Sequence, residues 1–347
     1  TYGQLVDIAD PPRFQQAMAL AHASAEAVGE EVQGTDKNFK AIRASDFMSG
    51  SKSFFDIFVQ LRPSKFLKIV KAGDEFDPER VVSYLKKGVK FFYLRTEAQE
   101  SYLSYCDQMA KFIIQKDGVG AAVKVSQALN LGEEVMSFYK SSGISESTLI
   151  YAQNYVIQVH EAVKRIDADR LAGIKKFLSD ISALEHGNAC AMMASLMMKP
   201  LRFSDPDTVA AVGFACLFHD LGLQGQPEIV RCENESEMSP EEVKLFHEHP
   251  IKGAQQLSEV RGVSEAVVQA VLQHHERRTR KGFPFELGAG SINGIAEIVG
   301  ICDEFVNALK RAQLNRDIDP IRYMEDHVFD GFSANVVEAF REAIFKR

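Results

Sequence analysis

From about residue 120 to its end, this chain carries apolar residues at helical spacing with almost no interruption. A helix with such a face must bury it against other helices, so the pattern predicts a helical bundle. Two sequence motifs in this region are typical of the first turn of a helix. Residues 204–207, with Pro206 in the first turn, open a helix expected to end at Gly222, and residues 239–242 (SPEE) open another. Pro250 predicts a break or kink in this second helix, because proline disfavours helix at the residue before it.

The first third of the chain has a different pattern. Apolar and aromatic residues cluster in short runs at FDIFVQL (55–61), FLKIVKAGDEF (66–76) and FFYLRTE (91–97), with turn signals between them and an amphipathic helix over 78–87. This pattern predicts a small α/β domain with a short sheet. The expected fold class is therefore mainly α, an all-α C-terminal bundle preceded by a small α/β domain. The predicted domains are 1–115 for the α/β domain, 116–150 for a helical linker and 151–347 for the helical domain.

Composition narrows the class of protein. A length of 347 residues suits about two domains, and the net charge of −8 gives no support to broad binding to DNA, RNA or anionic membranes. No run approaches the roughly 18 apolar residues of a membrane helix, and no signal peptide opens the chain, which begins at Thr1 without a methionine. The five cysteines are odd in number and lack C-x-x-C spacing, which predicts reduced thiols and a cytoplasmic location.

Polar residues interrupt the apolar helical faces at several places, and the stretch CLFHDLG (216–222) is the clearest case. Desolvating an ionised carboxylate is costly unless it has a partner. Taken singly, each such residue is more simply a core histidine bonded to a carbonyl, or a carboxylate at the edge of a stripe. Taken together, on faces that should converge on one core, they indicate a metal site. The residues are His186, His219, Asp220, His249, His274, His275 and Asp303.

Neutral imidazoles and carboxylates are ligands for iron, manganese or zinc, and the charge of a metal offsets the burial of aspartates. Seven ligands are too many for one ion. A shared carboxylate suits two ions about 3.5–4 Å apart with a bridging water. We therefore expect two divalent transition metals, iron first and manganese as the alternative. Asp220 would bridge them, with His219 beside it on one ion.

The order and spacing of these residues resemble the HD-GYP phosphodiesterases, all-helical metallohydrolases of the HD superfamily that cleave the bacterial messenger cyclic di-GMP. The resemblance covers about residues 150 to 345 and rests on an ordered set: His186, HDLG (219–222), HPIKGAQQL (249–257), HHER (274–277), GFP (282–284) and Asp303. It implies an HD-type bundle, before which small α/β domains often stand. It also implies two ligand sets joined by Asp220, namely His186, His219 and Asp303 on one metal and His249, His274 and His275 on the other.

The chain also departs from the family pattern. Leu223 replaces the lysine of H-D-x-G-K, and Phe283 keeps the ring of the GYP tyrosine without its hydroxyl. Residues 279–281 (TRK) stand where the family has D-G-x. Some members hold a third metal through a glutamate whose position here is Ser182, which favours two metals. The arginine-rich segment after the final aspartate is not matched in register, although Arg311 lies nearby.

The substrate contacts are expected in the loop that follows the histidine pair. Arg277, Arg280 and Lys281, with Arg278, put four cations within five residues, and Phe283 follows them. Such a run is often a solvated loop, yet it can also replace the charge missing at Leu223 toward a phosphodiester. The polar stretch 224–238 is either a lid over the site or a plain loop.

Three functions are consistent with these residues. The first is a phosphodiesterase for cyclic di-GMP or a related phosphate ester, with Asp220 and His219 at a dinuclear centre that generates the attacking hydroxide, and with weak turnover. The second is a catalytically degenerate metal-containing module that binds a nucleotide or another signalling protein. The third is a di-iron oxygenase, which some HD-superfamily relatives have become.

Overall fold

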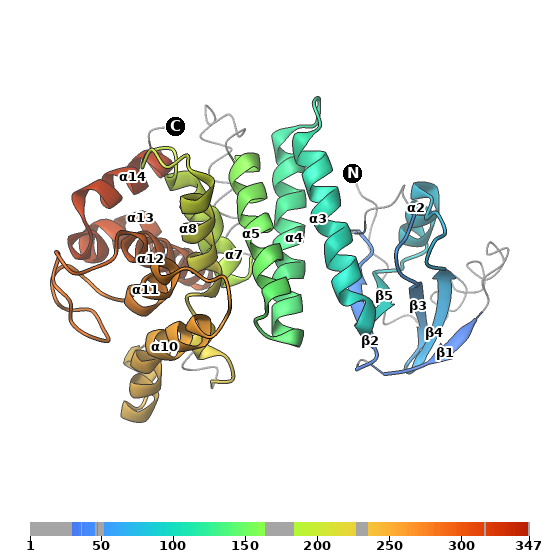
Figure 1. Cartoon of the computed structure of the whole chain (residues 1–347), viewed down its shortest axis with the longest axis horizontal. Coiled ribbons are helices and arrows are strands. Elements are labelled where there is room, and N and C mark those ends of the chain that lie inside the picture. The colour runs from blue at the N-terminus through green and yellow to red at the C-terminus, as the bar shows by residue number, and fades with distance from the viewer. Residues whose placement is uncertain are drawn as a thin grey trace. The chain divides into compact units, whose positions relative to one another are not determined.

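The fold is given by a computed structural model (Figure 1), which describes residues 30–345 except 36, 46, 48–51, 164–183, 227–234 and 316. The chain forms two units with a boundary between Met109 and Ala110, so that helix α3 (Gln99–Gln115) crosses it. The predicted domain boundary at residue 115 stays a prediction. Ser182 and the centre of the predicted lid lie outside the described residues.

The first unit is built on a five-stranded antiparallel sheet in the order β1-β4-β3-β5-β2. Its strands are β1 (Glu31–Gln33), β2 (Phe39–Arg43), β3 (Ile57–Arg62), β4 (Lys65–Val70) and β5 (Phe91–Arg95). The three runs predicted to form a sheet are β3, β4 and β5. Helix α2 (Pro78–Lys86) begins after Asp77, whose side chain accepts a hydrogen bond from the amide of Glu79. Aspartate before a proline-started helix is a common cap, because it satisfies a free amide.

Period-two alternation in the strands divides the apolar residues between the two faces of the sheet. Ile57 and Val59 join a large core that includes Tyr84 of α2 and Tyr102 of α3, while Phe58 between them points to a smaller aromatic cluster on the other face. The face of the sheet that carries the larger core is therefore the one that the helices cover.

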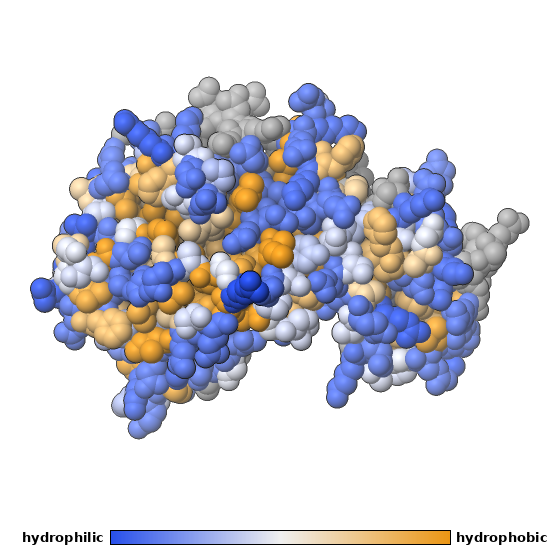
Figure 2. All heavy atoms as spheres, in the orientation of Figure 1, coloured by the Kyte–Doolittle hydropathy of each residue, from blue (hydrophilic) through white to orange (hydrophobic). Residues whose placement is uncertain are grey.

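The second unit is helical, which confirms the mainly α fold class. Its longer helices are α4 (Ala121–Ser142), α5 (Glu146–Val163), α7 (His186–Met197), α8 (Pro206–Phe218), α10 (Pro240–Ser258), α11 (Glu265–Gln273), α12 (Gly294–Leu314) and α14 (Ala334–Phe345), with the single-turn α13 (Pro320–Tyr323) before the last. None of the described helices has the length and apolar character needed to cross a bilayer. On the visible face of this unit, hydrophobic residues are interspersed with hydrophilic ones (Figure 2).

Helix α8 is the centre of the helical unit. Its residues from Val212 to Phe218 are all buried, and it packs against α5, α7, α11 and α12. A helix that is apolar on every side belongs in a core. The chain leaves α8 at His219, so the His-Asp pair emerges in the middle of the packed helices.

Helix α8 begins at Pro206, within the predicted start motif, and its cap is Asp205, whose carboxylate accepts from the amide of Thr208. Its predicted end is wrong. The same helix ends at Phe218 rather than Gly222, because residues 221–223 tighten into a 3₁₀ turn. The capping box of α10 is confirmed, with Ser239 and Glu242 each bonded to the other's backbone.

The break predicted at Pro250 is also wrong, since α10 continues through it to Ser258. Proline in a helix removes the N–H that would bond to the carbonyl four residues earlier, here that of Phe246. That carbonyl accepts a hydrogen bond from the ring of His249 instead. The free acceptor is thereby satisfied, and the helix continues past the proline.

Candidate metal centre

The seven predicted ligands lie on, or directly after, five helices, and their side chains gather in one region. His186 opens α7, His219 and Asp220 follow α8, and the remaining four come from α10, α11 and α12. Gly222 allows the close approach on which this depends, because a Cβ there would collide with the carbonyl oxygen of His249. The turn after α8 can therefore lie directly against α10. The ligands on the last three helices are His249, His274, His275 and Asp303.

One group of side chains gathers around Asp303. The Nε2 atom of His186 lies 2.9 Å from Oδ1 of Asp303, and the Nε2 atom of His219 lies 3.8 Å from the same oxygen. The Oδ2 atom of Asp220 completes the group, at 3.3 Å from Nε2 of His219 and 3.7 Å from Nε2 of His186. These atoms are close enough together to be ligands of one ion.

A second group lies on the other side of Asp220. The Nε2 atoms of His249 and His274 are 3.1 Å apart, and a ring nitrogen of His275 lies within 4.8 Å of both. The Oδ1 atom of Asp220 is 3.5 Å from Nε2 of His249 and 4.0 Å from Nε2 of His274. It has no hydrogen-bond partner among the described residues. Asp220 thus presents one carboxylate oxygen to each group.

Three of the histidines have their tautomer fixed by their own helix. The Nδ1 atoms of His219, His249 and His274 donate to the carbonyl oxygens three residues earlier, at 2.7, 2.5 and 2.6 Å. A carbonyl oxygen only accepts, so each Nδ1 carries a proton. In the neutral ring, Nε2 then holds a lone pair, which is the arrangement that a metal-binding histidine needs.

This tautomer assignment makes the second group a fit for a cation. The Nε2 atoms of His249 and His274 face each other at 3.1 Å, and neither has a proton to share when its ring is neutral. The Nε2 atom of His219 is buried and has no hydrogen-bond partner among the described residues. Buried polar atoms are normally paired, so the facing lone pairs of His249 and His274 suit a bound cation.

The local electrostatics support the same conclusion. Burial lowers the pKa of His249 to about 4 and holds the pKa values of His274 and His275 well below the ordinary range. These rings are therefore neutral at pH 7. Burial alone would raise the pKa of Asp303, but the hydrogen bond from His186 and the nearby charge of His219 lower it well below the usual value.

The pKa of His219 is shifted in the opposite direction, upward. Burial lowers its pKa, but Asp220, Asp303 and the bond to the Cys216 carbonyl together outweigh burial and raise the pKa to about 10. Without a cation, a proton on this ring balances the two carboxylates. A divalent ion would displace that proton, so metal binding and protonation compete at the same atom.

Two residues on α12 support the first group and were missed in the sequence. Asn307 donates through Nδ2 to Oδ1 of Asp303 at 2.9 Å, and Nζ of Lys310 lies 3.2 Å from Nδ1 of His186. They follow Asp303 by four and seven residues, so all three share one face of the helix. That spacing is the signal that could have identified them.

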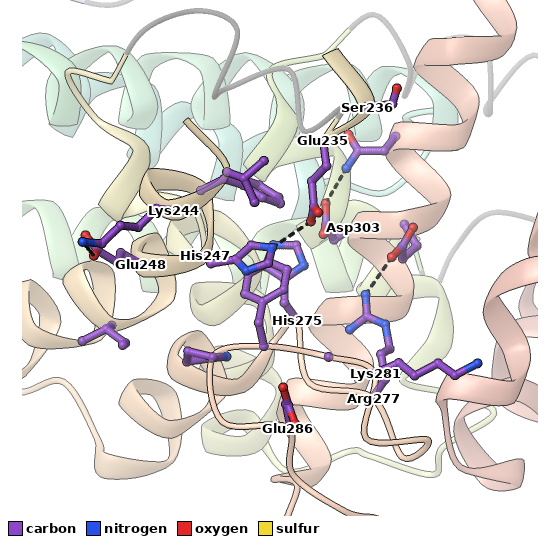
Figure 3. A pocket seen from close by; sticks show the side chains of 18 of the residues that line it. Glu235, Ser236, Lys244, His247, Glu248, His275, Arg277, Lys281, Glu286 and Asp303 are labelled. Carbon is purple, nitrogen blue, oxygen red and sulfur yellow. Dashed lines mark hydrogen bonds and ion pairs between the residues drawn. The ribbon is translucent and has the colours of Figure 1, made fainter. Parts of the chain in front are cut away.

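A pocket of about 980 Å³ opens beside the centre, with His275 and Asp303 among its lining residues (Figure 3). Asp220 keeps 26% of its side-chain surface exposed, although its Oδ1 atom is buried. His247, which the sequence pattern directs away from His249, also lines the pocket. Its Nε2 lies 3.0 Å from Oε1 of Glu235, as the dashed line in Figure 3 shows.

Phe283 stacks on two imidazoles. Its ring centroid is 4.1 Å from that of His247 and 4.4 Å from that of His275, with nearly parallel planes. Phe283 also packs against an apolar cluster made by Leu223 and Phe246. The position at which the family carries a lysine is therefore a buried leucine beside an aromatic ring.

The basic loop divides into two kinds of cation. The guanidinium of Arg277 donates to the carbonyls of His274 and Glu276 and pairs with Glu304 at 2.7 Å, while Arg278 pairs with buried Glu297. Both therefore contribute to the framework. Two exposed cations, together with Arg277 and Phe283, line the pocket; they are Arg280 and Lys281.

Buried Glu276 holds the loop after these cations and was also missed. Its carboxylate accepts from the amides of Phe285 and Leu287, each at 2.7 Å. Gly282 is needed in the same loop, because a Cβ there would collide with the backbone of His275 and Arg277. The loop is thereby fixed against the histidine pair.

Comparison with known proteins agrees with this architecture. The family model of the HD domain matches residues 174–331. The cyclic di-GMP phosphodiesterase PA4108 of Pseudomonas aeruginosa is 30% identical over 173 residues, which are 49% of this chain and 41% of that protein. This chain thus matches less than half the length of that relative. The solved structure of Bd1817, an HDG"Y"P protein from Bdellovibrio bacteriovorus, superposes with a TM-score of 0.60 at 18% identity, over 88% of this chain and 99% of the other.

The helical fold and its cluster of histidines and aspartates define an HD-domain protein. Residues 174–331 therefore form an HD domain, and the chain is similar to an HD-GYP-type protein of known structure and to a curated cyclic di-GMP phosphodiesterase.

Proposed function

We propose that this chain is a metal-dependent phosphodiesterase that hydrolyses a cyclic dinucleotide of the cyclic di-GMP type at a dinuclear centre. One observation carries the proposal: Asp220 presents Oδ1 to the group of His249 and His274 and Oδ2 to the group of His186 and His219. A carboxylate placed in this way suits two neighbouring ions. Iron is the first candidate and manganese the second, because imidazole and carboxylate ligands suit both.

Two ions here would supply a nucleophile from water at neutral pH and neutralise charge on the phosphoryl oxygens. The protein residues do the rest. His275 and Asp303 connect the centre to the pocket, and Asn307 and Lys310 contact Asp303 and His186. Arg280 and Lys281 line the pocket and would contact a phosphodiester bound there. The similarity to PA4108, which is named as a cyclic di-GMP phosphodiesterase, supports this substrate class.

The proposal includes weak turnover. Leu223 is buried against Phe246 and Phe283, and Arg277 is paired with Glu304, so the phosphate contacts depend on the exposed loop cations. Each charged or hydrogen-bonded contact that is lost costs on the order of 1.5–3 kcal/mol. Together such losses lower turnover by several powers of ten.

The test measures hydrolysis and metal content in the same sample. The protein is purified anaerobically with iron or with manganese, its metals are counted, and hydrolysis of cyclic di-GMP is followed by chromatography. Asp220→Asn should abolish turnover and metal retention, while Asp330→Asn, at an exposed aspartate outside both ligand groups, should retain both. Two ions per chain without any hydrolysis would instead favour a module that binds a nucleotide or protein partner.

A further inference from the structure

Cys190 lies against the first ligand group and has no place in the metal assignment so far. It follows His186 by one turn of α7, and its Sγ is 3.7 Å from Nε2 of His186. Its side chain is fully buried. The sulfur, both nitrogens and the carboxylate oxygen lie within 4.8 Å of one another, in a group made by His186, Cys190, His219 and Asp303.

The spacing in this group is that of atoms sharing one ion. Zinc–sulfur bonds of about 2.3 Å and zinc–nitrogen bonds of about 2.0–2.1 Å put tetrahedral ligand atoms about 3.5 Å apart. The distance from Sγ to Nε2 of His186 is close to that value. A second observation points to the same centre, because Nε2 of fully buried His219 faces the group without a hydrogen-bond partner among the described residues.

Two other buried cysteines show what a purely packing role looks like. Cys216 and Cys302 are as buried as Cys190, yet neither belongs to a group of possible metal ligands in the part of the chain that the structure describes. The thiol of Cys302 contacts the sulfur of Met197 at 3.7 Å. Small buried cysteines of that kind pack as apolar residues. Cys190 differs because its sulfur lies among nitrogen and oxygen donors.

We propose that Cys190 is a thiolate ligand of the ion held by His186, His219 and Asp303. The inference rests on the proposed metal centre and deepens it. As the ion enters, the S–H bond breaks, its electron pair forms the metal–sulfur bond, and the proton leaves to water. A coordinating thiol is deprotonated by the charge of the metal. Lys310, at 3.2 Å from the ring of His186, adds positive charge beside the new thiolate.

This ligand would make the two metal positions chemically different. The first has sulfur, nitrogen and oxygen donors, while the second has three imidazoles and one oxygen of Asp220. Thiolate favours iron(II), cobalt(II) and zinc over manganese and magnesium. The first position should therefore select a thiophilic ion even when the second accepts manganese.

Cobalt(II) tests the proposal, because its visible d–d bands report binding by any ligand and a near-ultraviolet charge-transfer band reports a thiolate. The metal-free full chain is titrated with Co²⁺ without oxygen. Wild type should show both bands. Cys190→Ser should keep the d–d bands, lose the charge-transfer band and bind Co²⁺ at the first position at least about tenfold more weakly.

Two matched variants identify the sulfur. Cys302→Ser makes the same change at a buried cysteine next to Asp303 and should keep the charge-transfer band. Cys232→Ser, at a cysteine outside the described residues, should keep it as well. A band that survives Cys190→Ser, or disappears in Cys232→Ser, overturns the proposal.

A further measurement needs no variant, in case Cys190→Ser does not fold. X-ray absorption of the zinc-loaded wild type should show a sulfur scatterer, and its absence overturns the proposal. Cobalt d–d bands without charge transfer in wild type would reject the thiolate and leave the dinuclear centre standing. Failure to bind Co²⁺ at all would reject both.

Discussion

The carbonyl oxygen of Phe246 accepts its hydrogen bond from the ring of His249, at 2.5 Å, in place of the backbone donor that a helix would normally provide. The missing donor is that of Pro250, which has no N–H. A residue that usually breaks helices thus frees the acceptor that orients a candidate metal ligand.

Pro250→Ala should therefore weaken metal binding. The new N–H competes with Nδ1 of His249 for the Phe246 carbonyl, which loosens the ring; we expect affinity at the second position to fall by about tenfold. The metal-free protein should gain stability, by up to about 3 kcal/mol, because proline is unfavourable inside a helix. Metal titration and urea unfolding measure the two effects. Pro240→Ala, in the first turn of the same helix, should leave affinity unchanged.

Asp220→Asn should lose both ions, whereas the wild type should retain two per chain. The amide keeps the shape of the carboxylate but offers one oxygen and no charge, so neither group is completed. The thermal midpoint of the loaded protein should fall toward that of the metal-free form. Elemental analysis with calorimetry measures this. Retention of two ions by the variant would show that Asp220 does not bridge.

Acid should destabilise the metal-free protein through His249. Its pKa is about 4 in the fold and about 6.5 in the unfolded chain. Above pH 6.5 the ring is neutral in both states, whereas between about 6.5 and 4 only the unfolded chain takes up the proton. Stability should therefore fall across that window, by on the order of 3 kcal/mol. Urea unfolding as a function of pH measures the slope, which His249→Gln should reduce.

Alkali should destabilise the metal-free protein through His219. Its pKa is raised to about 10, so its charged form adds stability that is complete below pH 6.5 and is lost as the pH rises through 10. His219→Gln should flatten this alkaline limb, whereas His249→Gln should not. An unchanged alkaline slope in His219→Gln would contradict the ion pair with Asp220.

Leu223→Lys combined with Phe283→Tyr should raise a feeble rate of cyclic di-GMP hydrolysis. The lysine restores a phosphate contact, while its burial beside Phe246 costs about 1–3 kcal/mol of stability. Leu223→Met, similar in volume but uncharged, is the control and should not change the rate. Chromatographic assays with a parallel melting curve separate the effects. Wild-type turnover as fast as that of ordinary family members would show that these departures are tolerated.

A chain beginning at residue 120 should fold and keep its metals, because all seven ligands lie downstream. Its weak point is buried Lys124, whose ammonium donates to the carbonyl of Ile114 at 2.7 Å and would lose that acceptor. A chain beginning at Gln99 retains α3 and serves as the comparison. Circular dichroism and metal counting decide, and an insoluble or metal-free product from both chains would count against an independent helical domain.

The sequence was sufficient to predict the helical fold and to mark the seven clustered residues, because buried polar residues on apolar stripes are visible as a pattern. It was not sufficient for β1 and β2, which are short, and β1 is largely exposed. The helix does not break at Pro250, because the ring of His249 donates to the Phe246 carbonyl in place of the missing backbone N–H.

Other residues were missed because their roles depend on distance rather than on pattern. Cys190 and Lys310 look like ordinary core and surface positions until α7 and α12 are packed together. Arg277 looked free to contact a substrate, but the sequence does not show that Glu304 lies 2.7 Å from it. Hydrogen-bond partners far apart in the chain are decided by packing, which periodicity alone does not specify.

The bonds from Nδ1 of His219, His249 and His274 to their own helices have a thermodynamic consequence. Each ring is already oriented before any ion arrives, so binding an ion freezes little additional side-chain motion. Preorganised ligands lose less conformational entropy on binding. The centre can therefore release and regain its ions without rebuilding the fold around them, and chelation should be reversible.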